Sequence, residues 1–248
     1  FPNSVILFNI AGASNSALMH FDDAINCYKQ AIRIEPNYAL AYNNLGTALK
    51  NKGDLKEAIA CYKEAVHIKP DFALAYYNLG TTLKNKGDLN EAIACFKEAV
   101  RIKPDYADAY NNLGNALKDK GDLTEAIACY KEAVGIYPDY AAAYYNMGNS
   151  LSDKGDLKEA IACYKETVRI KPDYANAYNN MGAALQLLNQ SELAKASYEK
   201  AISFKKDFNH AISGLGTVLL KQGKHSEGLE KLRQGDGSIF FNIKSGIS

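Results

Sequence analysis

The chain has 248 residues, of which 47% are hydrophobic, and its formal net charge is +1. This near-neutral balance excludes a strong overall field that would attract nucleic acid or an anionic membrane surface. No apolar run reaches the roughly 18 residues that a membrane span requires. We therefore expect neither nucleic acid nor a membrane among the partners of this protein.

Two residue types recur at a fixed spacing of 34 positions. The prolines are Pro2, Pro36, Pro70, Pro104, Pro138 and Pro172. The cysteines are Cys27, Cys61, Cys95, Cys129 and Cys163. A fixed period of this length indicates an array of stacked structural repeats. The cysteine spacing fits neither a disulfide framework nor a CxxC metal site. Because free thiols favour a reducing compartment, we expect a cytoplasmic protein.

Each 34-residue unit is predicted to form two helices, over about 39–51 and 55–68 in the second unit. Gly53 is predicted to end the first helix in the left-handed conformation, which glycine adopts without a steric penalty. Asp54 is then placed to cap the second helix, with Glu57 completing a capping box. The same Gly-Asp-Leu-x-Glu string recurs at Gly87, Gly121 and Gly155.

Apolar and small residues form one stripe on each predicted helix. In the first helix of the second unit the stripe is Ala41, Tyr42, Leu45, Gly46 and Leu49. In the second helix it is Ala58, Ile59, Tyr62, Ala65 and Val66. Since Gly46 and Ala58 are small, the two helices of a unit are expected to approach each other closely.

These core positions match the signature of the tetratricopeptide repeat. The matching residues of the second unit are Tyr42, Leu45, Gly46, Leu49, Ala58, Tyr62 and Pro70. Tyr replaces the signature Trp and Leu replaces the signature Tyr, and both changes keep the position apolar. The sequence resembles this family over almost its whole length. The resemblance implies an all-α fold of helix-turn-helix repeats stacked in a right-handed superhelix, or solenoid. It also implies that the first helices line the concave surface and the second helices the convex one.

The period predicts one array over 2–237 with about seven units. Their bounds are 5–38, 39–72, 73–106, 107–140, 141–174 and 175–208, followed by a degenerate unit over 209–237. Residues 238–248 are interpreted as a tail or as the start of a following segment, with a candidate strand at Ser238–Ile243. We expect the chain to be a fragment of a longer protein.

The sequence contains no P-loop, HExxH or CxxC motif. Its four histidines, His20, His67, His210 and His225, occupy four different repeat positions. We therefore expect a protein that is not an enzyme and that has no catalytic residues, metal site or cofactor. The cysteines lie beside core tyrosines in the second helices and are interpreted as packing residues.

An asparagine precedes Leu-Gly or Met-Gly in five successive repeats. These residues are Asn44, Asn78, Asn112, Asn146 and Asn180. At ~100° per residue, Asn44 and its copies point roughly 120–130° away from the core stripe. Their outer stripe also holds Asn115 and Asn149. Because a primary amide both donates and accepts hydrogen bonds, a row of such amides is suited to hold the backbone of an extended peptide.

Other side chains border the same predicted groove. Tyr77 and Tyr145 are candidate aromatic anchors, a residue type that often dominates binding energy. Lys50, Lys84 and Lys118 lie at its edge and would favour an acidic stretch of ligand. The alternative interpretation is that asparagine is merely tolerated there, since the family consensus often has it and its helix cost is only about 0.6 kcal/mol.

The leading functional hypothesis is a protein–protein interaction module that binds an extended peptide in the concave groove. The first alternative is a substrate-recognition or scaffolding segment of a larger enzyme such as a protein glycosyltransferase. The period and the NLG and NMG strings resemble the superhelical repeats of O-linked N-acetylglucosamine transferase, and that resemblance covers the repeats only. The second alternative is a self-associating structural array, joined through terminal repeats by Leu187, Leu188 and Ile239–Phe241.

Overall fold

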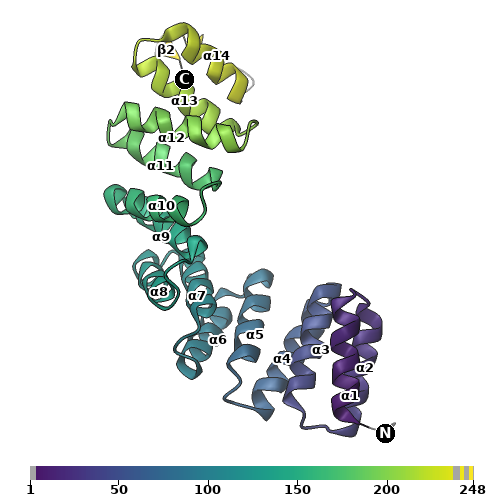
Figure 1. Ribbon diagram of the computed structural model, residues 1–248. Helices are drawn as coiled ribbons and strands as arrows, with labels where there is room; N and C mark the ends of the chain where they lie inside the picture. The colour runs from purple at the N-terminus through teal and green to yellow at the C-terminus, as the bar shows by residue number, and fades with distance from the viewer. Residues whose placement is uncertain (1–3, 237–240, 243–245, 248) are drawn as a thin grey trace. The chain divides into compact units, whose positions relative to one another are not determined.

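The computed structural model describes residues 4–236, 241–242 and 246–247. The chain divides into two compact halves, called unit 1 (Phe1–Glu125) and unit 2 (Ala126–Ser248) from here on, and each 34-residue element is called a repeat. Both are built from helices that follow one another along the chain, and those over residues 5–120 (α1 to α7) and 141–236 (α9 to α14) each pack against the next helix of their unit (Figure 1). The prediction of an all-α fold of helix-turn-helix repeats is confirmed.

The helices of unit 1 follow the 34-residue period. They are α1 (Val5–Ala17), α2 (Phe21–Ile34), α3 (Ala39–Lys52), α4 (Leu55–Ile68), α5 (Ala73–Lys86), α6 (Leu89–Ile102) and α7 (Ala107–Lys120). The division between the units falls inside α8 (Leu123–Ile136). The bounds predicted for the second repeat agree with α3 and α4 to within one residue, because helical period and turn chemistry are both local properties.

Unit 2 continues the same alternation of helices. Its further helices are α9 (Ala141–Lys154), α10 (Leu157–Ile170), α11 (Ala175–Leu187), α12 (Ser191–Phe204), α13 (Asn209–Lys221) and α14 (His225–Asp236). Two short strands, β1 (Phe241–Asn242) and β2 (Gly246–Ile247), pair antiparallel with Phe241 opposite Ile247. Only Phe241–Asn242 of the predicted strand at Ser238–Ile243 belongs to an observed strand, and the rest lies outside the described residues.

The two helices of a repeat interlock through a glycine and an aromatic ring. A Cβ atom added to Gly46 in α3 would lie 2.8 Å from Cε1 of Tyr62 in α4. The ring of Tyr62 is fully buried, and it occupies the space that a side chain at position 46 would need. The same pairing recurs as Gly12 with Tyr28, Gly80 with Phe96, Gly148 with Tyr164, and Gly182 with Tyr198. The close approach predicted at Gly46 is therefore an approach of backbone to ring.

The turn between the two helices of a repeat contains one residue in the left-handed conformation. As predicted, this residue is glycine in the second to fifth repeats, with φ between 92° and 103°. In the first and sixth repeats the same position is Met19 (φ 60°) and Asn189 (φ 57°). The left-handed conformation therefore belongs to the geometry of the repeat and is adopted even where no glycine is present.

The capping box predicted at Asp54 is not formed. Asp54 and Asp88 occupy the N-cap positions of α4 and α6, but neither side chain makes a capping hydrogen bond. Their ψ angles of 64° and 63° depart from the extended backbone that usually aims an N-cap side chain at the first turn. The Asp88 carboxylate instead lies 2.7 Å from Nζ of Lys86 across the turn, and Asp156 pairs with Lys154 in the same way at 3.0 Å.

Candidate functional site

The candidate site is the outer face of the first helices, defined by the repeated asparagines. These lie in α3, α5 and α7 of unit 1 and in α9 and α11 of unit 2, as Asn44, Asn78, Asn112, Asn146 and Asn180. All five are half-buried. A purely solvent-facing asparagine would be fully exposed. These side chains are partly covered because they contact the neighbouring repeats.

In unit 1 the asparagines donate hydrogen bonds to the preceding repeat. Nδ2 of Asn44 donates to Oδ1 of Asn9 at 3.1 Å, and Nδ2 of Asn78 donates to Oδ1 of Asn43 at 2.9 Å. In both cases the acceptor lies 35 residues earlier, which is one repeat plus one residue. Asn43 is only 2% exposed, so its amide is a buried acceptor. The repeated asparagine therefore joins successive first helices.

Where the acceptor position is a tyrosine, the same link is made to its hydroxyl. Nδ2 of Asn112 donates to the hydroxyl of Tyr77 at 2.9 Å. In unit 2, Nδ2 of Asn180 donates to the hydroxyl of Tyr145 at 3.2 Å and to Oδ1 of Asn149 at 2.9 Å. These links were not anticipated from the sequence. The signal was nevertheless present, because the residue 35 positions before each repeated asparagine is always Asn or Tyr.

The links leave the asparagines with different remaining capacity, since a primary amide has two N–H groups and one carbonyl oxygen. Asn180 donates twice and also accepts from Asn179 at 3.0 Å, so both of its N–H groups are used. Asn78 and Asn112 each donate once through the side chain, and no hydrogen bond to the side-chain oxygen Oδ1 of either residue occurs within the described residues. One N–H and one carbonyl oxygen therefore remain on Asn78 and on Asn112.

The candidate anchors Tyr77 and Tyr145 pack against the last residue of their own repeat as well as bordering the face. The ring of Tyr77 lies 5.0 Å from that of Tyr106, and the ring of Tyr145 lies 5.0 Å from that of Tyr174, measured between centroids. Burial raises the pKa of Tyr77, and it raises the pKa of Tyr106 to about 12. Both anchors are half-buried, so they are held in place by the stack.

The second asparagine position of the outer stripe serves the core tyrosine of the same repeat. Oδ1 of Asn149 accepts from the hydroxyl of Tyr164 at 3.0 Å as well as from Asn180. In the second repeat the corresponding residue is Thr47, whose hydroxyl lies 3.1 Å from that of Tyr62. Asn115 occupies this position in the fourth repeat and is half-buried.

The three lysines at the edge of the face do not share one environment. Nζ of Lys84 pairs with Asp119, 35 residues later, at 3.2 Å. Lys50 has no carboxylate partner in the part of the chain that the structure describes, because the residue 35 positions after it is Asn85. Lys118 holds the equivalent position in α7. In unit 1, Lys50 is therefore better placed than Lys84 to meet an acidic ligand.

The described residues also bear on three other functions: metal binding, nucleophilic chemistry and spanning a membrane. They contain no cluster of three or more His, Cys, Asp or Glu side chains arranged to hold a metal ion. Burial raises the pKa of Cys61, Cys95 and Cys163 to about 11, so these thiols stay protonated at neutral pH and are poor nucleophiles. None of the described helices is both long and apolar enough to cross a membrane.

Comparison with known proteins gives one consistent family. A family model described as TPR repeat matches residues 20–53, 46–87 and 82–121, and one described as tetratricopeptide repeat matches 105–173 and 139–207. The chain is similar to MamA, whose crystal structure matches it with a TM-score of 0.64 and 30% sequence identity, over 65% of this chain and 95% of that of MamA. YrrB, described as "a TPR protein with an unusual peptide-binding site", is 26% identical with a TM-score of 0.67, over 75% of this chain and 95% of that one. No curated protein matches the chain.

Proposed function

Because the chain belongs to the tetratricopeptide repeat family, we propose that it is a protein-interaction module whose outer first-helix face holds an extended peptide. The observation that carries this proposal is the unused hydrogen-bonding capacity of Asn78 and Asn112 on neighbouring helices of unit 1. The description of YrrB as a TPR protein with a peptide-binding site supports the same use of the fold.

The spacing of the helices suits a peptide of regular conformation. The first helices α3, α5 and α7 pack side by side, and packed helices lie roughly 8–10 Å apart. A polyproline II strand rises ~3.1 Å per residue with three residues per turn, so the same edge returns every ~9 Å. Asn78 and Asn112 would then meet backbone groups three residues apart in the ligand, with little demand on its sequence.

The ends of such a peptide would meet different side chains. Tyr77 lies beside Asn112 on the same face and offers the exposed part of its ring to an apolar ligand residue. Lys50, without a carboxylate partner in the described chain, would favour an acidic ligand residue toward α3. A substrate-recognition segment of a larger enzyme would use this face in the same way.

The test uses peptides selected from a random 12-residue library displayed on phage, with affinities measured by isothermal titration calorimetry. Asn112→Ala is expected to weaken binding about tenfold, since it removes both remaining ligand contacts of that amide. Tyr77→Phe is the matched control, because it breaks the same Asn112–Tyr77 hydrogen bond but leaves the Asn112 amide and the ring in place.

A ligand contact predicts that Asn112→Ala loses affinity and Tyr77→Phe retains most of it, with unchanged helical circular dichroism in both. Equal losses in the two variants would show that the hydrogen bond between repeats matters and the ligand contact does not. Unchanged affinity in Asn112→Ala would contradict the proposal directly.

A further inference from the structure

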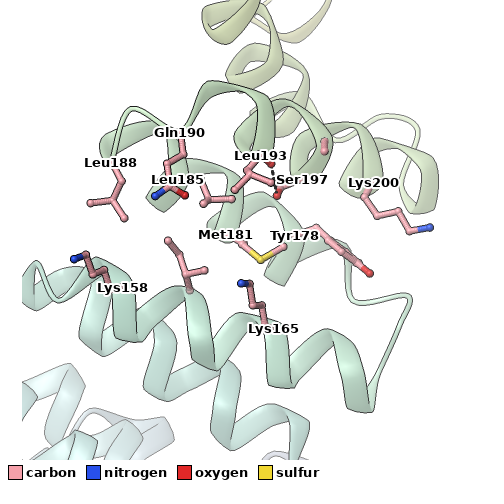
Figure 2. Close-up of a pocket in the computed structure, with 12 residues that line it drawn as sticks. Lys158, Lys165, Tyr178, Met181, Leu185, Leu188, Gln190, Leu193, Ser197 and Lys200 are labelled. Carbon is pink, nitrogen blue, oxygen red and sulfur yellow. Dashed lines mark hydrogen bonds between the residues drawn. The ribbon is translucent and has the colours of Figure 1, made fainter.

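A hollow lies in unit 2, between α10, α11 and α12, with a volume of about 510 Å³ (Figure 2). Tyr178, Met181 and Leu185 line it from one side of α11. Asn180 points away from that side, toward its partners Tyr145 and Asn149 in α9. The hollow is therefore separate from the outer face that carries the asparagines.

Two leucines make this hollow apolar. Leu188 and Leu193 line it, and Leu193 is 57% exposed. In the second to fifth repeats the position of Leu188 is always lysine, namely Lys52, Lys86, Lys120 and Lys154. The position of Leu193 is always glutamate in the same repeats, namely Glu57, Glu91, Glu125 and Glu159. Two charged positions of the repeat are thus apolar in the sixth.

In two of these repeats the replaced glutamate pairs with a lysine of the preceding repeat. In unit 1, Nζ of Lys63 lies 3.3 Å from Glu91, and Nζ of Lys97 lies 4.0 Å from Glu125. Lys165 of α10 is the equivalent of these lysines and lines the hollow together with Leu193. It has no carboxylate partner within the described residues, because the position that supplies one to Lys63 and Lys97 is a leucine here.

Two more lysines stand at the same hollow. Lys158 and Lys200 line it, no acidic side chain does, and neither lysine forms an ion pair in the described parts of the chain. Figure 2 shows Lys158 and Lys165 reaching from α10 toward the side formed by α11 and α12. The site therefore combines an apolar floor with three cations that lack a carboxylate partner among the described residues.

Two hollows at the turns of unit 1 differ from this one in chemistry. A hollow of about 480 Å³ there is lined by Asp54, Glu57 and Lys86 among others. The next, of about 500 Å³, is lined by Asp88, Glu91 and Lys120 among others. Both carry carboxylates beside their lysines, so the surface charge is balanced locally. Of these three hollows, only the one between α10, α11 and α12 combines lysines without carboxylates and an apolar floor.

We propose that this hollow docks a short acidic amphipathic segment of a partner protein, with bulky apolar side chains over Met181, Leu185 and Leu193. The carboxylates of the docked segment would pair with Lys158, Lys165 and Lys200. A neutral or basic segment would leave these cations unpaired at the edge of a desolvated contact, which is unfavourable.

A second copy of the chain fits less well. Among the described helices, α1 carries three exposed apolar side chains close together, Ile6 (64% exposed), Leu7 (54%) and Ile10 (55%). That helix contains no Asp or Glu, so it would not supply the carboxylates that the lysines require. Charge complementarity therefore favours an acidic segment of another protein.

The probe is a fluorescein-labelled 14-residue amphipathic peptide with leucine on one helical face and glutamate on the other. A matched peptide has glutamine in place of glutamate. Fluorescence anisotropy is expected to show binding of the glutamate peptide and at least about tenfold weaker binding of the glutamine peptide, since three ion pairs are lost. The affinity for the glutamate peptide should also fall with added salt.

Leu193→Glu is the decisive variant, because it restores the residue that the second to fifth repeats carry and offers Lys165 the carboxylate that Lys63 and Lys97 pair with. It is expected to fold like the parent and to weaken binding of the glutamate peptide at least about tenfold. Asn112→Ala, on the outer face, should leave this affinity unchanged. Leu193→Glu in turn should not affect the library peptides held at the outer face, so the two proposals fail independently.

Four results would overturn the inference. The first is equal affinity of the parent and Leu193→Glu for the glutamate peptide, and the second is equal affinity of the parent for the two peptides. The third is concentration-dependent dimerisation in sedimentation experiments that Leu193→Glu abolishes, which would assign the hollow to a second copy. Absence of any binding by the glutamate peptide up to about 1 mM, a free energy of only about −4 kcal/mol, also counts against it.

Discussion

At the scale of single residues, the turn within each repeat shows how a conformation persists when the residue best suited to it is absent. Gly53 and its copies carry positive φ angles, and so do Met19 and Asn189. For a residue with a Cβ atom, the left-handed region costs roughly 1–2 kcal/mol, and asparagine tolerates it better than methionine does. The two non-glycine turns therefore hold local strain that the packing of α1 with α2 and of α11 with α12 sustains.

Replacing these residues by glycine should relieve the strain. Met19→Gly is expected to raise the free energy of unfolding by about 1 kcal/mol, and Asn189→Gly by a few tenths, less than for methionine. Urea denaturation followed by circular dichroism measures both values. A loss of stability in Met19→Gly would show that its side chain, although exposed, contributes more than the backbone strain removes.

A second residue-scale prediction concerns the buried hydroxyl of Ser150. Its oxygen has no hydrogen-bond partner in the described structure, although the residue is fully buried. Alanine occupies the same position at Ala48, Ala116 and Ala184. Ser150→Ala should therefore stabilise the protein by about 1 kcal/mol, because an unsatisfied polar group leaves the core.

Thr82 provides the contrast for Ser150. It sits at the same repeat position, but its hydroxyl donates to the backbone oxygen of Asn78 at 2.8 Å. Thr82→Ala should lower the free energy of unfolding, since a satisfied hydroxyl and a buried methyl group are both removed. The prediction for Ser150 is refuted if both alanine variants are destabilised to the same extent.

At the scale of elements, the helix pair is held by contact between a glycine backbone and an aromatic ring. The buried ring of Tyr62 lies against Gly46, and the corresponding glycines Gly12, Gly80, Gly148 and Gly182 face a ring in the same way. Glycine inside a helix costs about 1 kcal/mol relative to alanine. The repeat accepts this cost at the glycine of the NLG string because a larger residue would displace the ring.

Gly46→Ala is expected to destabilise the protein by about 1–3 kcal/mol, despite its better helix propensity, because the new Cβ would lie 2.8 Å from a ring that cannot move into solvent. Gly135→Ala is the matched control. Gly135 lies in α8, and a Cβ atom added there would have no neighbour within 4 Å, so the substitution should stabilise by about 0.5–1 kcal/mol. Thermal denaturation of the two variants would contradict the ring contact if both shifted in the same direction.

At the scale of the whole molecule, both units depend on tyrosines buried with neutral hydroxyls. Burial raises the pKa of Tyr62 in unit 1 and of Tyr198 in unit 2 from 10.0 to about 12. A tyrosine whose pKa is higher in the folded than in the unfolded state stabilises the fold while its hydroxyl is protonated. This contribution to the free energy of unfolding is therefore complete below about pH 10, the unfolded pKa, and is lost as the pH rises from 10 toward 12.

We therefore expect alkaline unfolding between about pH 10 and 12, with loss of helical circular dichroism and tyrosine ionisation at 295 nm occurring together. Tyr62→Phe should reduce the alkaline loss of stability, and Phe96 shows that the repeat accepts phenylalanine there. Ionisation of every tyrosine near pH 10 with helicity unchanged would contradict the expectation.

The fold was predictable because its determinants are local and are repeated along the chain. The helical bounds of α3 and α4 follow from apolar spacing and from Gly53, and the helices of the later repeats follow the same pattern. The candidate site was predictable only in part. The outward direction of Asn78 and Asn112 follows from helical geometry, but their hydrogen bonds to the preceding repeat depend on how two neighbouring helices are aligned. Even the local capping box at Asp54 was wrong, because the backbone angle at that residue places its carboxylate elsewhere.

The sequence by itself determined the repeat, its helices and its turns, since period, glycine and proline act within a few residues of the chain. Only the tertiary structure decided which asparagines keep free amide groups, because their partners lie 35 residues away on another helix. It also decided that Leu188, Leu193 and three lysines share one hollow, since these residues come from α10, α12 and the neighbouring turn. Distances between helices control hydrogen bonds and ion pairs, and such distances are set by packing rather than by any short stretch of sequence.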